Sequence, residues 1–254
     1  AARPEPIPFF GELGSVNPMF MLPAAMAARA EELGKGWAAS LTMGAGQFCT
    51  NPGIAVVIDG PGADAFVQNA ATALQDVAPQ VMLTDGIAEA YCAGRDKFKS
   101  APSLRQVHLA DSEGRTAAPA LFETTGEEFK ANPTLHEEVF GPLGLVVRVS
   151  SLEEMRALAL ELDGQLTITL HMDDADVDAA RDLMPVLERK AGRLLANGFP
   201  TGVEVVDSMV HGGPYPASTN FGATSVGTLS IRRFLRPVSY QNLPEALLPQ
   251  DAAE

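Results

Sequence analysis

The chain has 254 residues, of which 46% are hydrophobic, and it carries a formal net charge of −14 at pH 7. This length and apolar content are enough for one large α/β domain, or for one domain with an appendage. The acidic balance without a basic cluster argues against nucleic acid and anionic membrane surfaces as partners, and no apolar run reaches the roughly 18 residues of a membrane span.

The first part of the chain predicts an extended start, one strand and one helix. Residues 1–8 contain three prolines, which indicates an extended linker. A strand is expected from Phe9 to about Glu12, where glycines interrupt the apolar run. An alanine-rich stretch at 23–33 favours a helix, and the glycines at 34 and 36 should end it.

The middle of the chain alternates apolar strands with amphipathic helices. The predicted strands are 54–58, 104–109, 120–124, 143–149, 166–171 and 193–197. The predicted helices are 64–77, 88–98, 151–162 and 174–192, and Pro185 should kink or split the last of them. This alternation predicts an α/β fold with a doubly wound, mostly parallel sheet flanked by helices.

The composition changes beyond residue 197. Residues 198–227 contain six glycines and three prolines without a period, which predicts a long functional loop. A short helix is expected at 228–234 and a last strand at 236–241, where Pro237 suits an edge position. The final residues from 243 should form a loose tail.

Cys49 is the first candidate for chemistry. It lies in a loop of small residues, between a helical run and an apolar strand, where free backbone N–H groups are available to favour a thiolate. The alternative is a small buried apolar residue, the usual fate of a free cysteine. Cys92, inside a helical run, is expected to be structural. Two cysteines in such different settings predict no disulfide framework and a reducing, cytoplasmic compartment.

Two further positions carry carboxylates in unusual settings. Glu12 stands among apolar residues and glycines; if it is buried, its pKa rises toward that of a general base, and otherwise it is an exposed charge at a turn. Glu138 precedes Phe140 and a Gly-Pro turn, which is either a hydroxyl acceptor beside an aromatic wall or a polar loop capped by a core phenylalanine. The chain has no dinucleotide or phosphate-loop fingerprint. Its four histidines lie far apart, so no metal site is predicted.

Three motifs, in this order, resemble the aldehyde dehydrogenase superfamily: Glu-Leu-Gly at 12–14, Gly-Gln-Phe-Cys-Thr at 46–50 and Glu-Val-Phe-Gly-Pro at 138–142. The resemblance covers the chain from about residue 9 to residue 241. Finer details, at 12–18 and 209–219, resemble the branch that acts on α-ketoglutarate semialdehyde.

The resemblance implies a role for each motif. Cys49 would be the nucleophile and Glu12 the general base. Glu138 would accept hydrogen bonds from the ribose of the nicotinamide cofactor, NAD or NADP, and Phe140 would pack beside it. The residues expected to line the aldehyde pocket are Phe48, Thr50 and His211.

The chain departs from the family's pattern around the substrate pocket. Ser15 stands where a second glycine is usual, and His211 stands where many members have phenylalanine. For His211, the alternative is a loop histidine bonded to the backbone. The usual lysine and Ser-Gly after the following Gly-Gly are replaced by residues 214–219. These departures bear on the substrate and not on the reaction class.

The resemblance also implies a division into parts. Residues 1–8 would be a linker, 9–227 the catalytic domain, and 228–254 an arm whose strand is available for oligomerisation or is an ordinary edge strand. An N-terminal cofactor-binding domain, present in full-length members, is expected as a missing partner, and a homo-oligomer is expected as the assembly.

The expected function is therefore NAD(P)-dependent oxidation of a semialdehyde to a carboxylate through a thioester on Cys49. One rival is a cysteine hydrolase or acyltransferase that pairs Cys49 with a histidine. The other rival is an isolated domain without activity, which only folds and associates.

Overall fold

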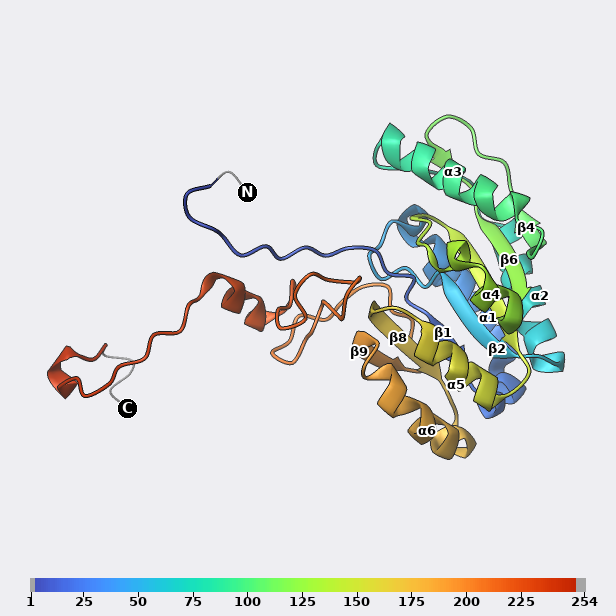
Figure 1. Ribbon diagram of the computed structural model, residues 1–254. Coiled ribbons are helices and arrows are strands. Elements are labelled where there is room, and N and C mark those ends of the chain that lie inside the picture. Colours follow the sequence, from blue (N-terminus) through green and yellow to red (C-terminus); the bar gives the residue numbers. More distant parts are fainter. Residues whose placement is uncertain (1–2, 250–254) are drawn as a thin grey trace.

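A seven-stranded sheet runs through the molecule in the order β4-β6-β7-β2-β1-β8-β9 (Figure 1). The computed structural model describes residues 3–249. The strands are β1 (Met19–Met21), β2 (Ile54–Ile58), β4 (Arg105–Leu109), β6 (Ala120–Thr125), β7 (Leu143–Val149), β8 (Gln165–His171) and β9 (Ala191–Ala196). Neighbouring strands are parallel, except that β4 pairs antiparallel with β6 at one edge. The predicted doubly wound, mostly parallel sheet is confirmed. A separate antiparallel pair joins β3 (Gln80–Val81) to β5 (Thr116–Ala117).

Helices cover both faces of this sheet (Figure 1). The first layer holds α1 (Pro23–Thr42) and α2 (Pro61–Gln75). The second layer holds α3 (Asp85–Ser100), α4 (Gly126–Ala131), α5 (Leu152–Glu161) and α6 (Val177–Leu187). The side chains of β1 alternate between the layers, because successive residues of a strand point to opposite faces. Met19 and Met21 join the first core and Phe20 the second, and all three are fully buried.

The strand predicted from Phe9 to Glu12 is wrong, because the first strand, β1, begins only at Met19. Phe9 is 74% exposed and gains nothing from the sheet. The Glu12 segment pairs instead with the long loop, through a single antiparallel bridge between Glu12 and Ser218. The N–H of Leu13 donates to the carbonyl of Ala217 over 2.9 Å.

The predicted end of the first helix at Gly34 is also wrong, since α1 continues to Thr42 with a kink at Arg29. Gly34 faces α2 so closely that a Cβ there would lie 2.4 Å from the carbonyl oxygen of Phe66. Gly34 therefore allows the two helices to pack together, and this contact outweighs its poor helix propensity.

Two later elements differ from expectation as well. The helix predicted over 174–192 is a 3₁₀ turn, η3 (Asp174–Asp176), followed by α6, which ends at Leu187 so that β9 can start at Ala191. Pro185 lies in the last turn of α6 and does not split it. The strand predicted at 236–241 does not form within the described residues, because no other strand lies beside it to complete a ladder.

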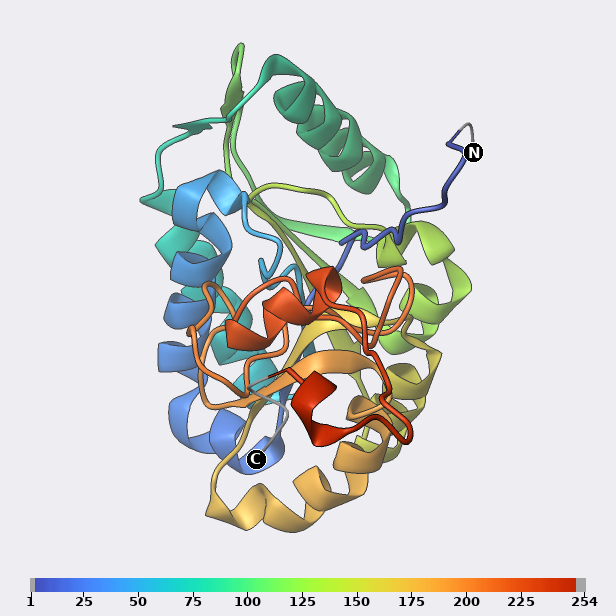
Figure 2. The ribbon, with the colours of Figure 1, turned by 90° about the vertical axis from the view of Figure 1, so that its left-hand side faces the viewer.

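The ends of the described chain leave the α/β body on the same side (Figures 1 and 2). Residues 3–8 have no regular structure, and the residues beyond β9 form an irregular loop followed by the 3₁₀ turns η4 (Thr228–Phe234) and η5 (Glu245–Leu247). The predicted tail continues to 254, and its last five residues lie outside the described range. Within residues 3–249, no helix has the length and apolar character needed to cross a bilayer.

Candidate active site

The three motifs come together because each immediately precedes one of three adjacent strands. The Glu12 segment leads into β1, the Cys49 loop into β2, and the segment of Glu138 and Phe140 into β7. The order β7-β2-β1 in the sheet places these three parallel strands side by side. The amino ends of these strands therefore lie at the same end of the sheet, and the motifs that precede them lie there too.

Positive backbone angles shape the Cys49 loop. Gly44, Ala45 and Gly46 have φ values of 56°, 58° and 66°, a region that favours glycine. At Gly46 a Cβ would lie 2.3 Å from the carbonyl carbon of Gly141. The thiol loop thus fits against the Gly-Pro turn that follows Phe140, which explains the small residues in both motifs.

Hydrogen bonds fix the two ends of this loop. Asn51 Nδ2 donates to the carbonyl of Gly141 over 3.0 Å. Asn17 Nδ2 donates to the carbonyl of Cys49 over 2.9 Å and to that of Asn51 over 3.0 Å. The thiol of Cys49 is nevertheless exposed, so the alternative of a buried, purely structural cysteine is wrong.

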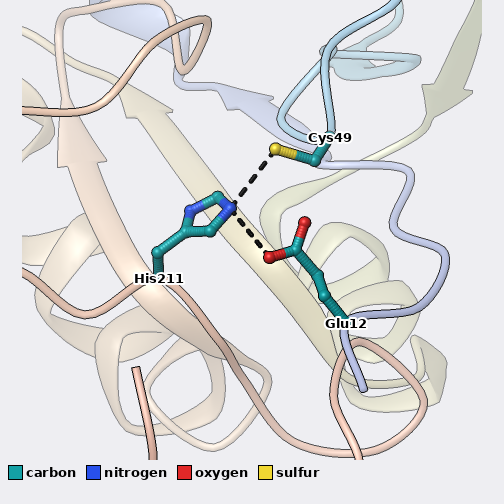
Figure 3. Close-up of side chains that lie close together, drawn as sticks. All are labelled: Glu12, Cys49 and His211. Atoms are coloured by element: carbon teal, nitrogen blue, oxygen red, sulfur yellow. Dashed lines mark hydrogen bonds and ion pairs between the residues drawn. The ribbon is translucent and has the colours of Figure 1, made fainter. Parts of the chain in front are cut away.

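His211 arrives from the long loop after β9 and contacts both Cys49 and Glu12 (Figure 3). Its Nε2 lies 3.3 Å from Cys49 Sγ and 3.2 Å from Glu12 Oε2. The imidazole is 4% exposed, and its backbone N–H donates to Thr224 Oγ1 over 2.8 Å. The long loop is therefore part of the site, and His211 lies against the thiol itself.

The glycines of the loop let it return to the sheet. A Cβ on Gly213 would lie 2.2 Å from the carbonyl oxygen of Gln165, at the start of β8. A Cβ on Gly192, near the start of β9, would lie 2.2 Å from the carbonyl oxygen of Gly212. The Gly-Gly pair after His211 therefore packs against the amino ends of two strands, and this packing fixes where the imidazole lies.

The electrostatics of the cluster couple His211 to both of its neighbours. Hydrogen bonds that its Nε2–H donates to Cys49 and Glu12 raise the pKa of His211 to about 9, against the opposing effect of burial. The pKa of Glu12 is lowered, first by its hydrogen bond from His211 and also by one from Ser225, whose Oγ lies 3.1 Å away. Its side chain is 33% exposed, so burial does not dominate. The condition for a raised pKa, a buried carboxylate, is therefore not met, and the alternative of an exposed charge holds.

Glu138 is the carboxylate of the site whose pKa is raised. Burial raises its pKa to about 7, a hydrogen bond from Ser15 N–H opposes this rise, and the charge of Glu12 adds to it. Ser15 N lies 3.3 Å from Glu138 Oε2. A Cβ on Gly14 would lie 2.9 Å from the same oxygen, so the glycine of the Glu-Leu-Gly motif makes room for this carboxylate.

The remaining predicted residues surround these groups. Phe140 lines two hollows together with Glu138, one of about 30 Å³ beside Ser15 and Asn51 and one of about 230 Å³ beside α3. Phe48 packs its ring over Gly44. Thr50 is only 1% exposed. Their predicted contacts with cofactor and aldehyde stay predictions.

Sequence reasoning missed the residues that hold the Glu12 segment in place. Gln165 Oε1 accepts hydrogen bonds from the N–H groups of Val16 and Asn17 over 2.9 and 3.1 Å, and from Ser15 Oγ over 3.0 Å. These residues are separated from Gln165 by about 150 positions, so no local pattern connects them. Ser15, which departs from the family's usual glycine, is part of this network.

The structure also gathers donor atoms that the spacing of the histidines did not predict. One ligand atom each from Glu12, Cys49 and His211 lies within 4.8 Å of the other two. Among the described residues, this is the cluster whose composition suits a metal ion.

No family model matches the chain. Curated relatives match it along nearly its whole length. Alpha-ketoglutaric semialdehyde dehydrogenase 2 of Azospirillum brasilense is 51% identical over 255 aligned residues, which cover 100% of this chain and 49% of that protein. Alpha-ketoglutaric semialdehyde dehydrogenase of Acinetobacter baylyi is 43% identical and covers 97% of this chain and 48% of its own length. The resemblance to the aldehyde dehydrogenases is confirmed.

Solved structures of aldehyde dehydrogenases share the fold. Gamma-glutamyl-gamma-aminobutyraldehyde dehydrogenase of Burkholderia cenocepacia matches 87% of this chain with a TM-score of 0.71 at 17% identity, over 44% of its own chain. 1-Pyrroline-5-carboxylate dehydrogenase from Thermus, solved with bound NAD, matches 89% with a TM-score of 0.69 at 19% identity, over 43% of its chain. This chain spans about half the length of the curated relatives it matches.

Proposed function

We propose that the chain is the catalytic half of an NAD(P)-dependent semialdehyde dehydrogenase that oxidises α-ketoglutarate semialdehyde to 2-oxoglutarate. The observation that carries this proposal is the exposed thiol of Cys49 beside Glu12 and His211, in a chain 51% identical to a relative with that name. Residues 9–227 would form the catalytic domain, and an N-terminal domain would complete the cofactor site.

The first step would take place at the thiol. The thiolate of Cys49 attacks the aldehyde carbon, a C–S bond forms, and the carbonyl electron pair moves to the oxygen. The imidazolium of His211, 3.3 Å from Sγ, stabilises the thiolate before the attack. The backbone N–H of Cys49 is a candidate donor for the resulting oxyanion.

Glu138 and Phe140 fit the proposed cofactor. A carboxylate beside an aromatic ring, at the rim of a hollow next to the thiol loop, suits a ribose hydroxyl and the adjoining ring. A nicotinamide held by Glu138 and Phe140 would supply the hydride acceptor that the oxidation of the substrate carbon requires. What remains on Cys49 is a thioester.

Hydrolysis of the thioester would use Glu12. The carboxylate takes a proton from water, the hydroxide attacks the acyl carbon, and the thiolate of Cys49 leaves with the C–S electron pair. Acylation removes the charge of the thiolate, so His211 then pairs with Glu12 alone. Glu12 is 33% exposed, which lets water reach it.

The contact between Cys49 and His211 also favours a second candidate, a cysteine hydrolase. In a triad of that kind, the acid binds the ring nitrogen that faces away from the nucleophile. Here Glu12 and Cys49 contact the same Nε2. Nδ1 of His211 is buried without a hydrogen bond from the described residues. This geometry differs from a triad and supports the dehydrogenase.

An activated ester separates the candidates without any cofactor, because it acylates the thiol directly. With p-nitrophenyl acetate we expect a burst of nitrophenol that Cys49→Ser abolishes. Glu12→Gln should keep the burst and slow the following steady rate by about 10²-fold or more, the usual contribution of a general base. A hydrolase would instead lose the steady rate in His211→Gln and keep it in Glu12→Gln, which would overturn the proposal. Cys92→Ser is the matched control.

Dehydrogenase activity itself requires the cofactor half. We expect this chain alone to produce no reduced nicotinamide from α-ketoglutarate semialdehyde, and to do so after mixing with the N-terminal half of the Azospirillum brasilense relative. The same mixture with Cys49→Ser is the control. Activity with other semialdehydes but not with this one would contradict the substrate assignment.

We also propose that copies of the chain associate through 236–241. This segment has exposed apolar side chains, with Val238 54% and Tyr240 46% exposed. It has no partner strand among the described residues. The edge strand β9 borders an apolar hollow of about 410 Å³ that α6 also lines, which suits an added strand of a neighbouring copy.

For the location we propose the cytoplasm, because both cysteines are free.

A further inference from the structure

We propose that Cys49 Sγ, His211 Nε2 and Glu12 Oε2 form a binding site for Zn²⁺, and that the ion blocks the thiol when it is bound. Binding itself does not depend on the proposed function. Only the inhibition rests on Cys49 being the nucleophile.

The distances match those around a tetrahedral zinc ion. Zn–S bonds of about 2.3 Å and Zn–N or Zn–O bonds of about 2.0 Å place neighbouring ligand atoms about 3.3–3.5 Å apart. Sγ and Nε2 are 3.3 Å apart, and Nε2 and Oε2 are 3.2 Å apart. All three ligand atoms lie within 4.8 Å of one another. The ion would need only small side-chain movements to enter.

The three donors come from parts of the chain that are already fixed. His211 is held by the bond of its N–H to Thr224 Oγ1, and the Cys49 loop is held by Asn17. Glu12 is bound by Ser225 Oγ over 3.1 Å. Preformed donors reduce the ordering that a metal would otherwise have to impose, so the site exists before the ion arrives.

The site leaves space, open to solvent, for the remaining coordination position. Glu12 and His211 line a hollow of about 120 Å³, and Cys49 is exposed. Three protein ligands with one open position are the arrangement of accessible zinc sites, in contrast to closed structural sites. Arg233 lines the same hollow, so a chloride or hydroxide can complete the coordination more readily than a neutral group.

The donor types select the metal. One thiolate, one imidazole and one carboxylate suit Zn²⁺ and Co²⁺, whereas Mg²⁺ and Ca²⁺ require several oxygen ligands. Zinc binding turns the thiolate into a ligand, which removes the electron pair that would attack a substrate. The proton on Nε2 of His211 leaves to solvent when the nitrogen becomes a ligand, so zinc binding should strengthen as the pH rises. The same ion takes Nε2 and the carboxylate of Glu12 out of proton transfer.

Cobalt provides a direct test on the chain, without substrate or cofactor. Titration with Co²⁺ should give a thiolate-to-cobalt charge-transfer band and the visible bands of a tetrahedral ion, and Zn²⁺ should abolish both. Cys49→Ser should lose the charge-transfer band, and Cys92→Ser should keep it. A band that survives Cys49→Ser, or that is lost in Cys92→Ser, would overturn the proposal.

The other two ligands are tested by affinity. Glu12→Gln and His211→Gln should each weaken Zn²⁺ binding by at least about tenfold, which is the scale of losses around metal sites. Thermal melting of the metal-free variants shows whether each is folded. If His211→Gln unfolds, Glu12→Gln alone decides, and an unchanged zinc affinity in folded Glu12→Gln would contradict the site.

Protection of the thiol tests the functional consequence. Zn²⁺ should slow alkylation of Cys49 by iodoacetamide at least about tenfold and leave Cys92 unaffected, while Mg²⁺ at the same concentration should do nothing. It should also abolish the burst with p-nitrophenyl acetate, and a chelator should restore it. An ester burst that persists with zinc bound would refute the blocking of the thiol. An absent burst with intact cobalt spectra would refute the proposed function instead.

Discussion

His211 is the residue on which the chemistry of the site depends most. One nitrogen faces both Cys49 and Glu12, which raises the pKa of His211 to about 9 and lowers the pKa of Glu12. The sequence predicted that His211 lines the aldehyde pocket, but it did not predict the contact of His211 with Cys49. Cys49 and His211 are 162 positions apart, and no local pattern encodes a distance of that kind.

The reactivity of the two thiols should differ. Cys49 is exposed and lies against His211, whereas Cys92 is only partly exposed and packs against the core of the second layer. We expect iodoacetamide to label Cys49 at least about tenfold faster, since the thiolate is the reactive form. Mass spectrometry of the labelled peptides measures both rates in one sample. His211→Gln should reduce the difference, and equal slow labelling of both thiols would argue against an activated Cys49.

Glu138 should make the stability depend on pH. Its pKa is raised from 4.5 to about 7 in the fold, so the folded chain holds this proton more tightly than the unfolded chain. The unfolded chain therefore binds fewer protons between pH 4.5 and 7, and stability falls as the pH rises through this window. One pKa unit corresponds to ~1.4 kcal/mol of unfolding free energy. Because Glu138 is exposed to solvent on one side and its charge is screened there, the loss of stability should be only a fraction of that value.

Urea unfolding at several pH values measures this effect. Glu138→Gln should flatten the dependence and leave the variant more stable than the parent above pH 7. Glu89→Gln changes an exposed glutamate on α3 and serves as the control. The raised pKa of Glu138 would be contradicted if the stability of the parent chain rose between pH 4.5 and 7, and if the Glu89→Gln control did not account for the rise.

At the level of elements, sequence reasoning succeeded where a strand is long and uniformly apolar. β2 and β7 were predicted with their observed bounds, because continuous runs of branched residues suit buried parallel strands. β1 was missed because it is only three residues long and contains no β-branched side chain. The end of the first helix was predicted wrongly at Gly34 for a different reason. Gly34 packs against α2, and such a tertiary contact cannot be read from the local sequence.

The Gly46 position tests how tightly the thiol loop fits. Gly46 and Gly114 both have positive φ, 66° and 56°, so alanine costs each about 1–2 kcal/mol of backbone strain. A Cβ on Gly46 would also collide with Gly141, whereas a Cβ on Gly114 would meet nothing within 4 Å. Gly46→Ala should therefore cost roughly 1–3 kcal/mol more than Gly114→Ala.

Chemical unfolding gives both stabilities, and the ester burst reports on the thiol. Gly46→Ala should reduce the burst along with stability, since the loop must move away from the turn after Phe140. Gly114→Ala should keep the burst of the parent chain. Equal losses of stability in the two variants would show that strain alone, and not the contact, explains the glycine.

On the scale of the whole molecule, the proposed catalytic groups and the proposed association surface are separate. The site lies at the amino ends of the strands, while the apolar hollow lies between α6 and β9 at the sheet edge. Sequence alternation predicted the sheet and its layers. It also predicted a strand at 236–241, which does not form within the described residues because no strand lies beside it.

Truncation after residue 235 should separate folding from association. The residues beyond η4 are exposed and contribute little to the core, so the shortened chain should melt within a few degrees of the parent. Light scattering of the parent should give a mass that is a multiple of the 26.8 kDa chain, and the truncated chain should give one copy. A truncated chain that keeps the mass of the parent would show that association uses another surface.

The bridge between Glu12 and Ser218 has a consequence for the order in which the molecule is made. Glu12 and its partners Ser225 and His211 are about 200 positions apart, and such distant contacts form late in folding. During synthesis, the sheet up to β9 can assemble before His211 reaches Cys49. The activation proposed for the thiol would therefore begin only when the long loop is complete, and a chain stopped before residue 211 would fold in large part without it.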